Sequence, residues 1–263
     1  MKIISVLPEE GPKPQAEGPS RRMLGATDLY LAKRLSGVTT TLHPGEITAI
    51  CGPNGAGKSS LLQFLAGLLA PDEGQVTLGD EDIAALHPRA RAQAIGYLPQ
   101  EGEVAWDVAV RSLVALGRLP HRDRGEAEVA AALAALDLEA LAERPVSRLS
   151  GGERARVLLA RVLAGTPQWI LADEPLAALD LAHQLALLGH LRRAAQAGTG
   201  VVLVVHDLAL AMNGADRVIV LESGSVAADG APEEALSAAV IERVWGVPAR
   251  WLGEPGARAL VAG

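Results

Sequence analysis

Short runs of apolar residues alternate with longer amphipathic stretches along most of this chain of 263 residues. The runs EITAIC at 46–51, WILAD at 169–173 and VVLVV at 201–205 are typical of strands buried on both faces of a parallel sheet. A helix is predicted over about 181–197, and leucines recur at helical spacing just after Lys58. This alternation of strands and helices predicts an α/β domain with a mostly parallel sheet.

Further strands and an insertion complete the predicted fold class. Strands are predicted at QVTL (75–78) and at AIGYLPQ (94–100), and 216–230 is predicted to form two strands around a glycine turn. The fold therefore has an antiparallel β part beside its mostly parallel sheet. Only helical patterns occur at about 101–165, so we expect an all-helical subdomain inserted into the α/β core.

The two ends of the chain differ from its centre. Residues 1–22 are rich in proline and are predicted to be a disordered extension, ahead of a domain at 23–263. A C-terminal tail at about 231–263 is predicted to begin with a helix near Pro232. No run of 18 or more apolar residues occurs, and the start lacks the apolar core of a signal peptide. We therefore expect neither a membrane span nor a secretion signal.

Composition narrows the classes of function. The formal net charge of −7 argues against a dedicated nucleic-acid binder, because such proteins carry a basic surface. The single cysteine, Cys51, excludes an internal disulfide and a multi-cysteine metal site, and we expect it to be a small buried residue. Aromatic residues make up 3% of the chain, so the core must consist mainly of aliphatic side chains.

The stretch GPNGAGKS at 52–59 fits the phosphate-loop pattern G-x-x-x-x-G-K-[ST], with a predicted strand before it and a helix after it. Its glycines let backbone N–H groups turn toward phosphate oxygens, and the helix start favours an anion. Lys58 is the last of four lysines, and we expect its compact ammonium to reach the β- and γ-phosphates. Ser59 is predicted to bind Mg²⁺. This context favours a phosphate site over a glycine turn with an incidental lysine. The predicted nucleotide-binding residues here are Gly52, Pro53, Asn54, Gly55, Ala56, Gly57, Lys58, Ser59 and Ser60.

Two carboxylates, Asp173 and Glu174, stand at the C-terminal end of the predicted strand WILAD. Ligands bind at this end of the strands in open α/β sheets. Asp173 is predicted to hold Mg²⁺, usually through waters, and Glu174 to be the general base that acts on an attacking water. An N-cap pair for the next helix is the alternative, because Asp-Glu-Pro also resembles a helix start.

Two more polar side chains follow predicted strands. His206 comes directly after VVLVV and is predicted to hydrogen-bond a γ-phosphate; a hydrogen-bonded structural histidine is the alternative. Gln100 ends the stretch AIGYLPQ and is predicted to contact Mg²⁺ or the attacking water. We therefore expect both side chains to act with Glu174 in catalysis.

A second glycine-rich helix start, LSGGE, occupies 149–153. Ser150 and Glu153 match the S-x-x-E capping box, which is the simplest interpretation. A capping box does not require Gly151 and Gly152, and each glycine costs about 1 kcal/mol inside a helix relative to alanine. Bare N–H groups at a helix start bind anions, and the helical insert should hold this stretch far from the phosphate loop. We therefore expect LSGGE to contact ATP that is bound to a second chain.

Six pieces in order, GPNGAGKS, Gln100, LSGGE, WILADE, AALD at 177–180 and His206, resemble the ATP-binding-cassette (ABC) ATPases over about 155 residues. The resemblance implies a P-loop NTPase (RecA-like) core that hydrolyses ATP, with Mg²⁺ as cofactor. It implies a head-to-tail dimer of two copies of the chain, with ATP between one phosphate loop and the other copy's LSGGE. Glu174 would polarise water, and Asp180 would couple the two sites across the dimer.

Two further segments resemble a subgroup of these ATPases. VALGRLPHR at 114–122 and VIERVWGVPARWL at 240–252 are similar to segments in ATPases of importers for iron-siderophores, haem and vitamin B12. The resemblance implies two transmembrane permease subunits as partners and a periplasmic or surface binding protein that delivers the chelate. It also implies a peripheral location at the cytoplasmic face of the inner (plasma) membrane. Alternatively, these segments only pack the insert and the tail. The aromatic residue that stacks on adenine in the family is not clearly placed, and Tyr30 is the nearest candidate.

Three other functions compete with this one. The chain could serve another class of ABC transporter, or it could be a non-transport ABC ATPase that acts on DNA or ribosomes. A long coiled-coil insertion, zinc-binding cysteines or a tandem cassette would favour the non-transport function, and the sequence has none of them. A P-loop kinase or GTPase would leave LSGGE unexplained, and no N-K-x-D follows Lys58.

Overall fold

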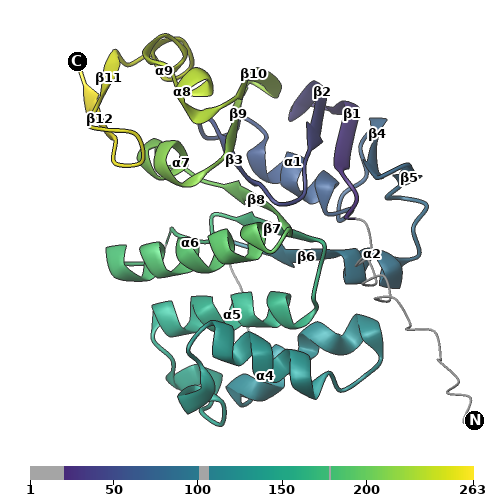
Figure 1. Cartoon of the computed structure of the whole chain (residues 1–263). Helices are drawn as coiled ribbons and strands as arrows, with labels where there is room; N and C mark the ends of the chain where they lie inside the picture. The colour runs from purple at the N-terminus through teal and green to yellow at the C-terminus, as the bar shows by residue number, and fades with distance from the viewer. Residues whose placement is uncertain (1–20, 101–106, 178) are drawn as a thin grey trace, which may run out of the picture.

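The computed structural model describes residues 21–100, 107–177 and 179–263. Its central sheet has six strands: β3 (Ile47–Cys51), β6 (Ile95–Leu98), β7 (Trp169–Asp173), β8 (Gly200–Val204), β9 (Arg217–Glu222) and β10 (Ser225–Gly230). Their order is β10-β9-β3-β8-β7-β6, and every neighbouring pair is parallel except β10 and β9 (Figure 1). The predicted α/β domain with a mostly parallel sheet is therefore confirmed.

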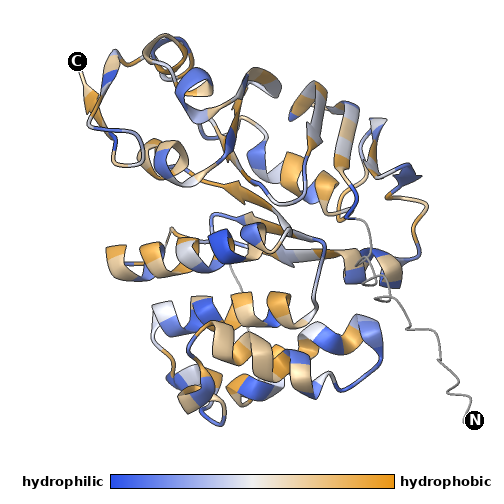
Figure 2. Cartoon of the chain, viewed as in Figure 1, coloured by the Kyte–Doolittle hydropathy of each residue, from blue (hydrophilic) through white to orange (hydrophobic). Residues whose placement is uncertain are grey.

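Apolar side chains cover both faces of this sheet. In β3, Ala49 packs into one hydrophobic core and Ile50 into the other, and Leu203 and Val204 of β8 divide in the same way. Successive side chains of a strand point to opposite faces, so a strand between two cores has no polar alternation. Figure 2 shows that the central strands are largely hydrophobic, whereas the helices carry both hydrophobic and hydrophilic positions.

A four-stranded antiparallel sheet lies over one face, together with two helices. These elements are β1 (Leu24–Leu31), β2 (Leu35–Leu42), β4 (Glu73–Leu78), β5 (Glu81–Asp82), α1 (Lys58–Leu65) and α2 (Pro88–Ala94). The sheet order is β2-β1-β4-β5. Strands β1 and β2 are not predicted from the sequence, because irregularities in the β1–β2 register interrupt the alternation after Ala26 and after Leu29. The antiparallel part of the fold is thus larger than the sequence predicts, since the prediction is based on the pair of strands at 216–230.

Helices form a layer on the opposite face. Its elements are α3 (Val110–Ala115), η1 (Leu116–His121), α4 (Glu126–Ala135), η2 (Glu139–Leu141), η3 (Val146–Arg148), α5 (Gly151–Ala164) and α6 (Leu181–Gln196). Figure 1 shows α6 between α5 and the sheet. The apolar residues of α3, α4 and α5 belong to the same core as the strand residues that face α6. The all-helical insert of the predicted fold class is confirmed over the described residues, and residues 101–106 lie outside them.

The C-terminal tail contains more structure than the sequence predicts. After α7 (Leu208–Gly214), it has α8 (Pro232–Ala235), α9 (Ala238–Trp245) and a hairpin of β11 (Ala249–Leu252) and β12 (Ala259–Ala262). The helix at Pro232 is confirmed. The hairpin carries little sequence signal, because β11 and β12 are four residues each and pair only with each other.

The predicted extension at 1–22 falls mostly outside the described residues. Arg22 lies inside them: it pairs with Glu81, and its carbonyl oxygen accepts a hydrogen bond of 2.9 Å from Nε1 of Trp169. The packed part of the chain therefore includes the last residue of the predicted extension. Among the helices described, none is long and apolar enough to cross a membrane.

Candidate functional site

The loop at 52–57 connects the end of β3 to the start of α1. Gly55 and Gly57 have φ angles of 79° and 98°, in the left-handed region that glycine adopts without steric cost. A Cβ atom on Gly57 would lie 2.5 Å from the carbonyl oxygen of Arg34, so only glycine fits there. Gly57 makes no side-chain cap for α1, which leaves the first backbone N–H groups available to an anion.

Lys58 is the first residue of α1 and is only 6% exposed. Its ammonium donates hydrogen bonds to the carbonyl oxygens of Gly52 (2.9 Å) and Pro53 (3.0 Å) in the same loop. Burial lowers the pKa of Lys58, and the carboxylate of Glu174 acts in the opposite direction. Lys58 also lines a cavity of about 510 Å³, a volume typical of small-molecule sites. The cavity residues are Lys33, Arg34, Asn54, Gly55, Gly57, Lys58, Ser59, Ser60, Glu174 and His206.

Ser59 and Asp173, both predicted from the sequence to bind Mg²⁺, lie in contact. The Ser59 hydroxyl donates a hydrogen bond of 3.1 Å to Oδ1 of Asp173, at the end of β7. Burial raises the pKa of Asp173, and the hydrogen bond from Ser59 opposes that shift. Mg²⁺ takes oxygen ligands, so the hydroxyl and the carboxylate suit this ion.

Glu174 lies between Gln100 and His206. Nε2 of Gln100 donates to Oε2 of Glu174 at 2.7 Å, and Nε2 of His206 lies 2.5 Å from Oε1. The three residues follow β6, β7 and β8, which are neighbours in the sheet, so their parallel direction brings the side chains together. Glu174 has a φ of 48°, which is uncommon for a residue other than glycine. Such strained backbones cost about 1–3 kcal/mol and cluster at active sites.

The predicted capping box at LSGGE is confirmed. The Ser150 hydroxyl accepts a hydrogen bond of 3.2 Å from the backbone N–H of Glu153, and the Glu153 carboxylate accepts one of 2.8 Å from the backbone N–H of Ser150. None of residues 149–153 lines the cavity at the phosphate loop. Asp180, predicted to act across a dimer, caps α6 in its own chain by accepting a hydrogen bond of 2.9 Å from the backbone N–H of His183. These two sets of residues therefore stand apart from the cavity of their own chain.

Two basic residues that sequence analysis does not find, Lys33 and Arg34, line the cavity. They occupy the turn between β1 and β2, and the pairing of these strands carries the turn to the phosphate loop. One signal is present, because Lys33 is one of four lysines in the chain. Tyr30, the candidate for adenine stacking, lies on β1, is 41% exposed and is not part of the cavity lining. Its role stays a prediction.

Comparison with known proteins agrees with this geometry. The family model described as ABC transporter matches residues 35–177. The chain is 44% identical to the hemin import ATP-binding protein HmuV of Myxococcus xanthus, over 85% of this chain and 90% of that protein. It is 41% identical to the HmuV of Streptomyces coelicolor, over 95% of this chain and 92% of that one. The chain therefore belongs to the ABC transporter family and is one of its ATP-binding subunits.

Solved structures show the same relationship. A metal-chelate type ABC transporter in an inward-facing conformation matches with a TM-score of 0.79 and 26% identity, covering 92% of this chain and 97% of that chain. A dimeric ATP-binding cassette bound to ADP and phosphate matches with a TM-score of 0.70 and 26% identity, covering 80% of this chain and 98% of that chain. Within the family, the chain is an ATP-hydrolysing subunit of an importer, and the resemblance to the siderophore, haem and vitamin B12 group is confirmed.

Proposed function

We propose that this chain is the energy-coupling ATPase of a metal-chelate importer and that Mg²⁺ is its cofactor. The observation that carries the proposal is that the phosphate loop, Glu174 and His206 line one cavity, with Asp173 hydrogen-bonded to the lining residue Ser59 and Gln100 hydrogen-bonded to Glu174. These groups come from the start of α1 and from the ends of β6, β7 and β8. Together they supply an anion site, oxygen ligands for a cation and a base.

The residues divide the work of hydrolysis. The loop and Lys58 bind the phosphates, and Ser59 and Asp173 would hold Mg²⁺, which neutralises phosphate charge when bound. Glu174 orients the attacking water and accepts its proton. Gln100 holds one carboxylate oxygen of Glu174, and His206 holds the other. We propose that His206 contacts the γ-phosphate once ATP is in the cavity.

A second copy of the chain completes the site. LSGGE lies outside the cavity of its own chain, although α5 begins there with two glycines and its capping box is formed. A helix start of this kind attracts an anion. The likeness to a dimeric cassette that holds ADP and phosphate supports a head-to-tail pair in which each copy's Ser150, Gly151 and Gly152 contact the other copy's ATP.

We propose that η1 is part of the surface that meets the permease. Leu116 and Leu119 are 40% and 69% exposed. Arg89 of α2 donates hydrogen bonds to the carbonyl oxygens of Pro120 and, at 2.8 Å, His121. These bonds hold an apolar turn against the core, where a short helix of a membrane subunit can pack on it.

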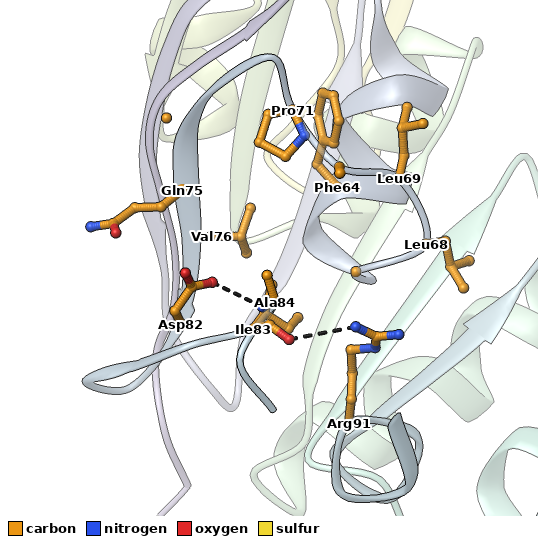
Figure 3. A pocket seen from close by; sticks show the side chains of 13 residues that line it. Phe64, Leu68, Leu69, Pro71, Gln75, Val76, Asp82, Ile83, Ala84 and Arg91 are labelled. Atoms are coloured by element: carbon orange, nitrogen blue, oxygen red, sulfur yellow. Dashed lines mark hydrogen bonds between the residues drawn. The ribbon is translucent and has the colours of Figure 1, made fainter. Parts of the chain in front are cut away.

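A second cavity, of about 320 Å³, has Arg91 of α2 in its lining (Figure 3). Phe64 and Leu69 line it, and Leu68 at its edge is 60% exposed. Gly67 lies against the side chain of Arg91 in α2, the same helix that binds η1. The apolar edge of α1 and the apolar turn of the insert are therefore linked by one helix, and we assign both to the permease contact.

The relatives support a proposal for the cargo and the location. The named function of several curated relatives is hemin import, and one structural relative is a metal-chelate type transporter. On this basis we propose haem as cargo, with iron-siderophores and cobalamin as the alternatives. A binding protein would deliver the chelate to two permease subunits. The ATPase would then lie peripherally at the cytoplasmic face of the inner membrane. Another transporter class and a non-transport ABC ATPase are the competing functions.

The test of this proposal is reconstitution. The chain is co-purified with its membrane and binding-protein partners, placed in lipid vesicles and assayed for ATP hydrolysis with haem, an iron-siderophore or cobalamin on the binding protein. We expect the haem-loaded protein to stimulate hydrolysis most. Stimulation by another chelate would change the cargo, and activity that is independent of any membrane partner would refute the importer function.

Two variants test the catalytic assignments. Glu174→Gln should trap an ATP-bound dimer with little turnover, and wild-type turnover would remove Glu174 as the base. Ser150→Arg should leave ATP binding by the single chain unchanged and abolish turnover. Ser237→Arg is the matched control, since Ser237 also precedes a helix but makes no side-chain cap. Normal turnover by Ser150→Arg would reduce LSGGE to a helix cap.

A further inference from the structure

The imidazole of His183 covers Gly152 at the start of α5. Gly152 is buried, and a Cβ atom there would lie 2.2 Å from Cδ2 and 2.5 Å from Nε2 of the ring. His183 belongs to the first turn of α6, which runs beside α5 (Figure 1). The helix that carries LSGGE is therefore packed, at its N-terminal end, on a side chain from the helix that follows Asp180.

Asp180 holds this ring in one orientation. Its Oδ1 accepts the backbone N–H of His183 at 2.9 Å and lies 2.7 Å from Nδ1 of the imidazole. A carboxylate at this distance accepts the Nδ1 proton, which leaves Nε2 and Cδ2 on the side toward Gly152. The ring cannot swing away without breaking this hydrogen bond, so it sets a fixed surface for α5 to rest on.

We propose that His183 is a positioning residue for the anion site at Gly151 and Gly152. The capping box fixes Ser150 and Glu153 within α5, but it does not relate α5 to the core. The apolar residues of α5 place the helix in the core, and the pair of His183 and Asp180 adds a contact at its N-terminal end. The inference rests on the proposed function, in which this helix start binds the ATP of a second copy. The contact with His183 also explains why position 152 is glycine, because a Cβ atom there would overlap the imidazole of the same chain.

The contact itself is tested by a double-mutant cycle on thermal unfolding. Gly152→Ala should lower the melting midpoint, because the added methyl meets a ring that Asp180 holds in place. Adding His183→Ala should restore most of that loss, since the space above residue 152 is then free. Equal losses in both backgrounds would show that His183 does not pack on Gly152, and they would overturn the proposal.

The positioning role is tested by ATP hydrolysis. His183→Ala should lower kcat about tenfold, since small displacements of a binding group have effects of this size or larger. The affinity of the single chain for a fluorescent ATP analogue should change less than about twofold. His183→Phe keeps a ring over Gly152 and should recover part of the lost kcat. His43→Ala, at an exposed histidine, is the control and should match the wild type.

The assay separates this inference from the function on which it rests. Wild-type kcat in His183→Ala, beside a Glu174→Gln variant that dimerises with ATP and does not turn over, overturns the inference alone. Absence of ATP hydrolysis by the wild type together with absence of ATP-dependent dimers in Glu174→Gln overturns the proposed function. A parallel loss of affinity and kcat in His183→Ala also counts against positioning, because it indicates general disruption.

Discussion

Two glycines of the phosphate loop differ in a way that stability measurements can resolve. Gly55 and Gly57 have φ angles of 79° and 98°, so alanine at either position costs about 1–2 kcal/mol in backbone strain. At Gly57 the new Cβ would also lie 2.5 Å from the Arg34 carbonyl oxygen and 2.6 Å from Cδ2 of Leu35, whereas at Gly55 nothing lies within 4 Å. Overpacking adds about 1–3 kcal/mol, so the free energy of unfolding of Gly57→Ala should be lower than that of Gly55→Ala by that amount.

The assay is thermal unfolding without nucleotide, so that effects on ligand binding do not enter. A domain of this size changes its melting midpoint by about 2–4 °C for each kcal/mol, so Gly57→Ala should melt at least about 2 °C below Gly55→Ala. Gly246→Ala is a control outside the site, because Gly246 has a φ of 70° and a Cβ atom there would have no neighbour within 4 Å. Equal midpoints for Gly55→Ala and Gly57→Ala would refute the packing of the β1–β2 turn against the loop.

Three further predictions concern charge and protonation. Burial lowers the pKa of His190 in the folded chain, and the positive charge of Arg193 acts in the same direction. The neutral imidazole therefore contributes its full stabilisation above the ordinary pKa of 6.5, and this contribution is lost as the pH falls below that value. The melting midpoint of His190→Gln should therefore fall less between pH 7 and pH 5 than that of the wild type, and equal slopes would contradict this. Burial raises the pKa of Cys51 to about 12, so a thiol reagent at pH 8 should label it only after unfolding; labelling of the folded chain would show that the thiol is accessible. Replacing Lys33 and Arg34 together with alanine should raise the KM for ATP about tenfold at an unchanged melting midpoint, because charged hydrogen bonds to phosphate are lost; an unchanged KM would remove them from the site.

The strand ends show how far the sequence alone reaches. Asp173, Glu174 and His206 each follow an apolar run too continuous for a half-exposed strand, so a parallel sheet and a common edge for these side chains could be predicted. The hydrogen bonds of Glu174 with Gln100 and His206 depend also on the order of the strands in the sheet. No local sequence pattern contains this order. Lys33 and Arg34 could not be predicted for the same reason, since their turn reaches the cavity only through the pairing of β1 with β2.

Short stretches of sequence are enough to identify the chemical groups of this protein: a phosphate loop, a carboxylate pair, a polar residue after each neighbouring strand and a capped glycine helix start. These features are local, because each depends on a few consecutive residues and on the strand or helix that they begin or end. Which of these groups act together depends on the three-dimensional fold. In the folded chain, Ser59 hydrogen-bonds to Asp173, Glu174 contacts both Gln100 and His206, and His183 packs against Gly152. LSGGE lies outside the cavity. Such contacts join residues far apart in the chain, and they exist only because the packing of two hydrophobic cores on one sheet brings those residues into reach.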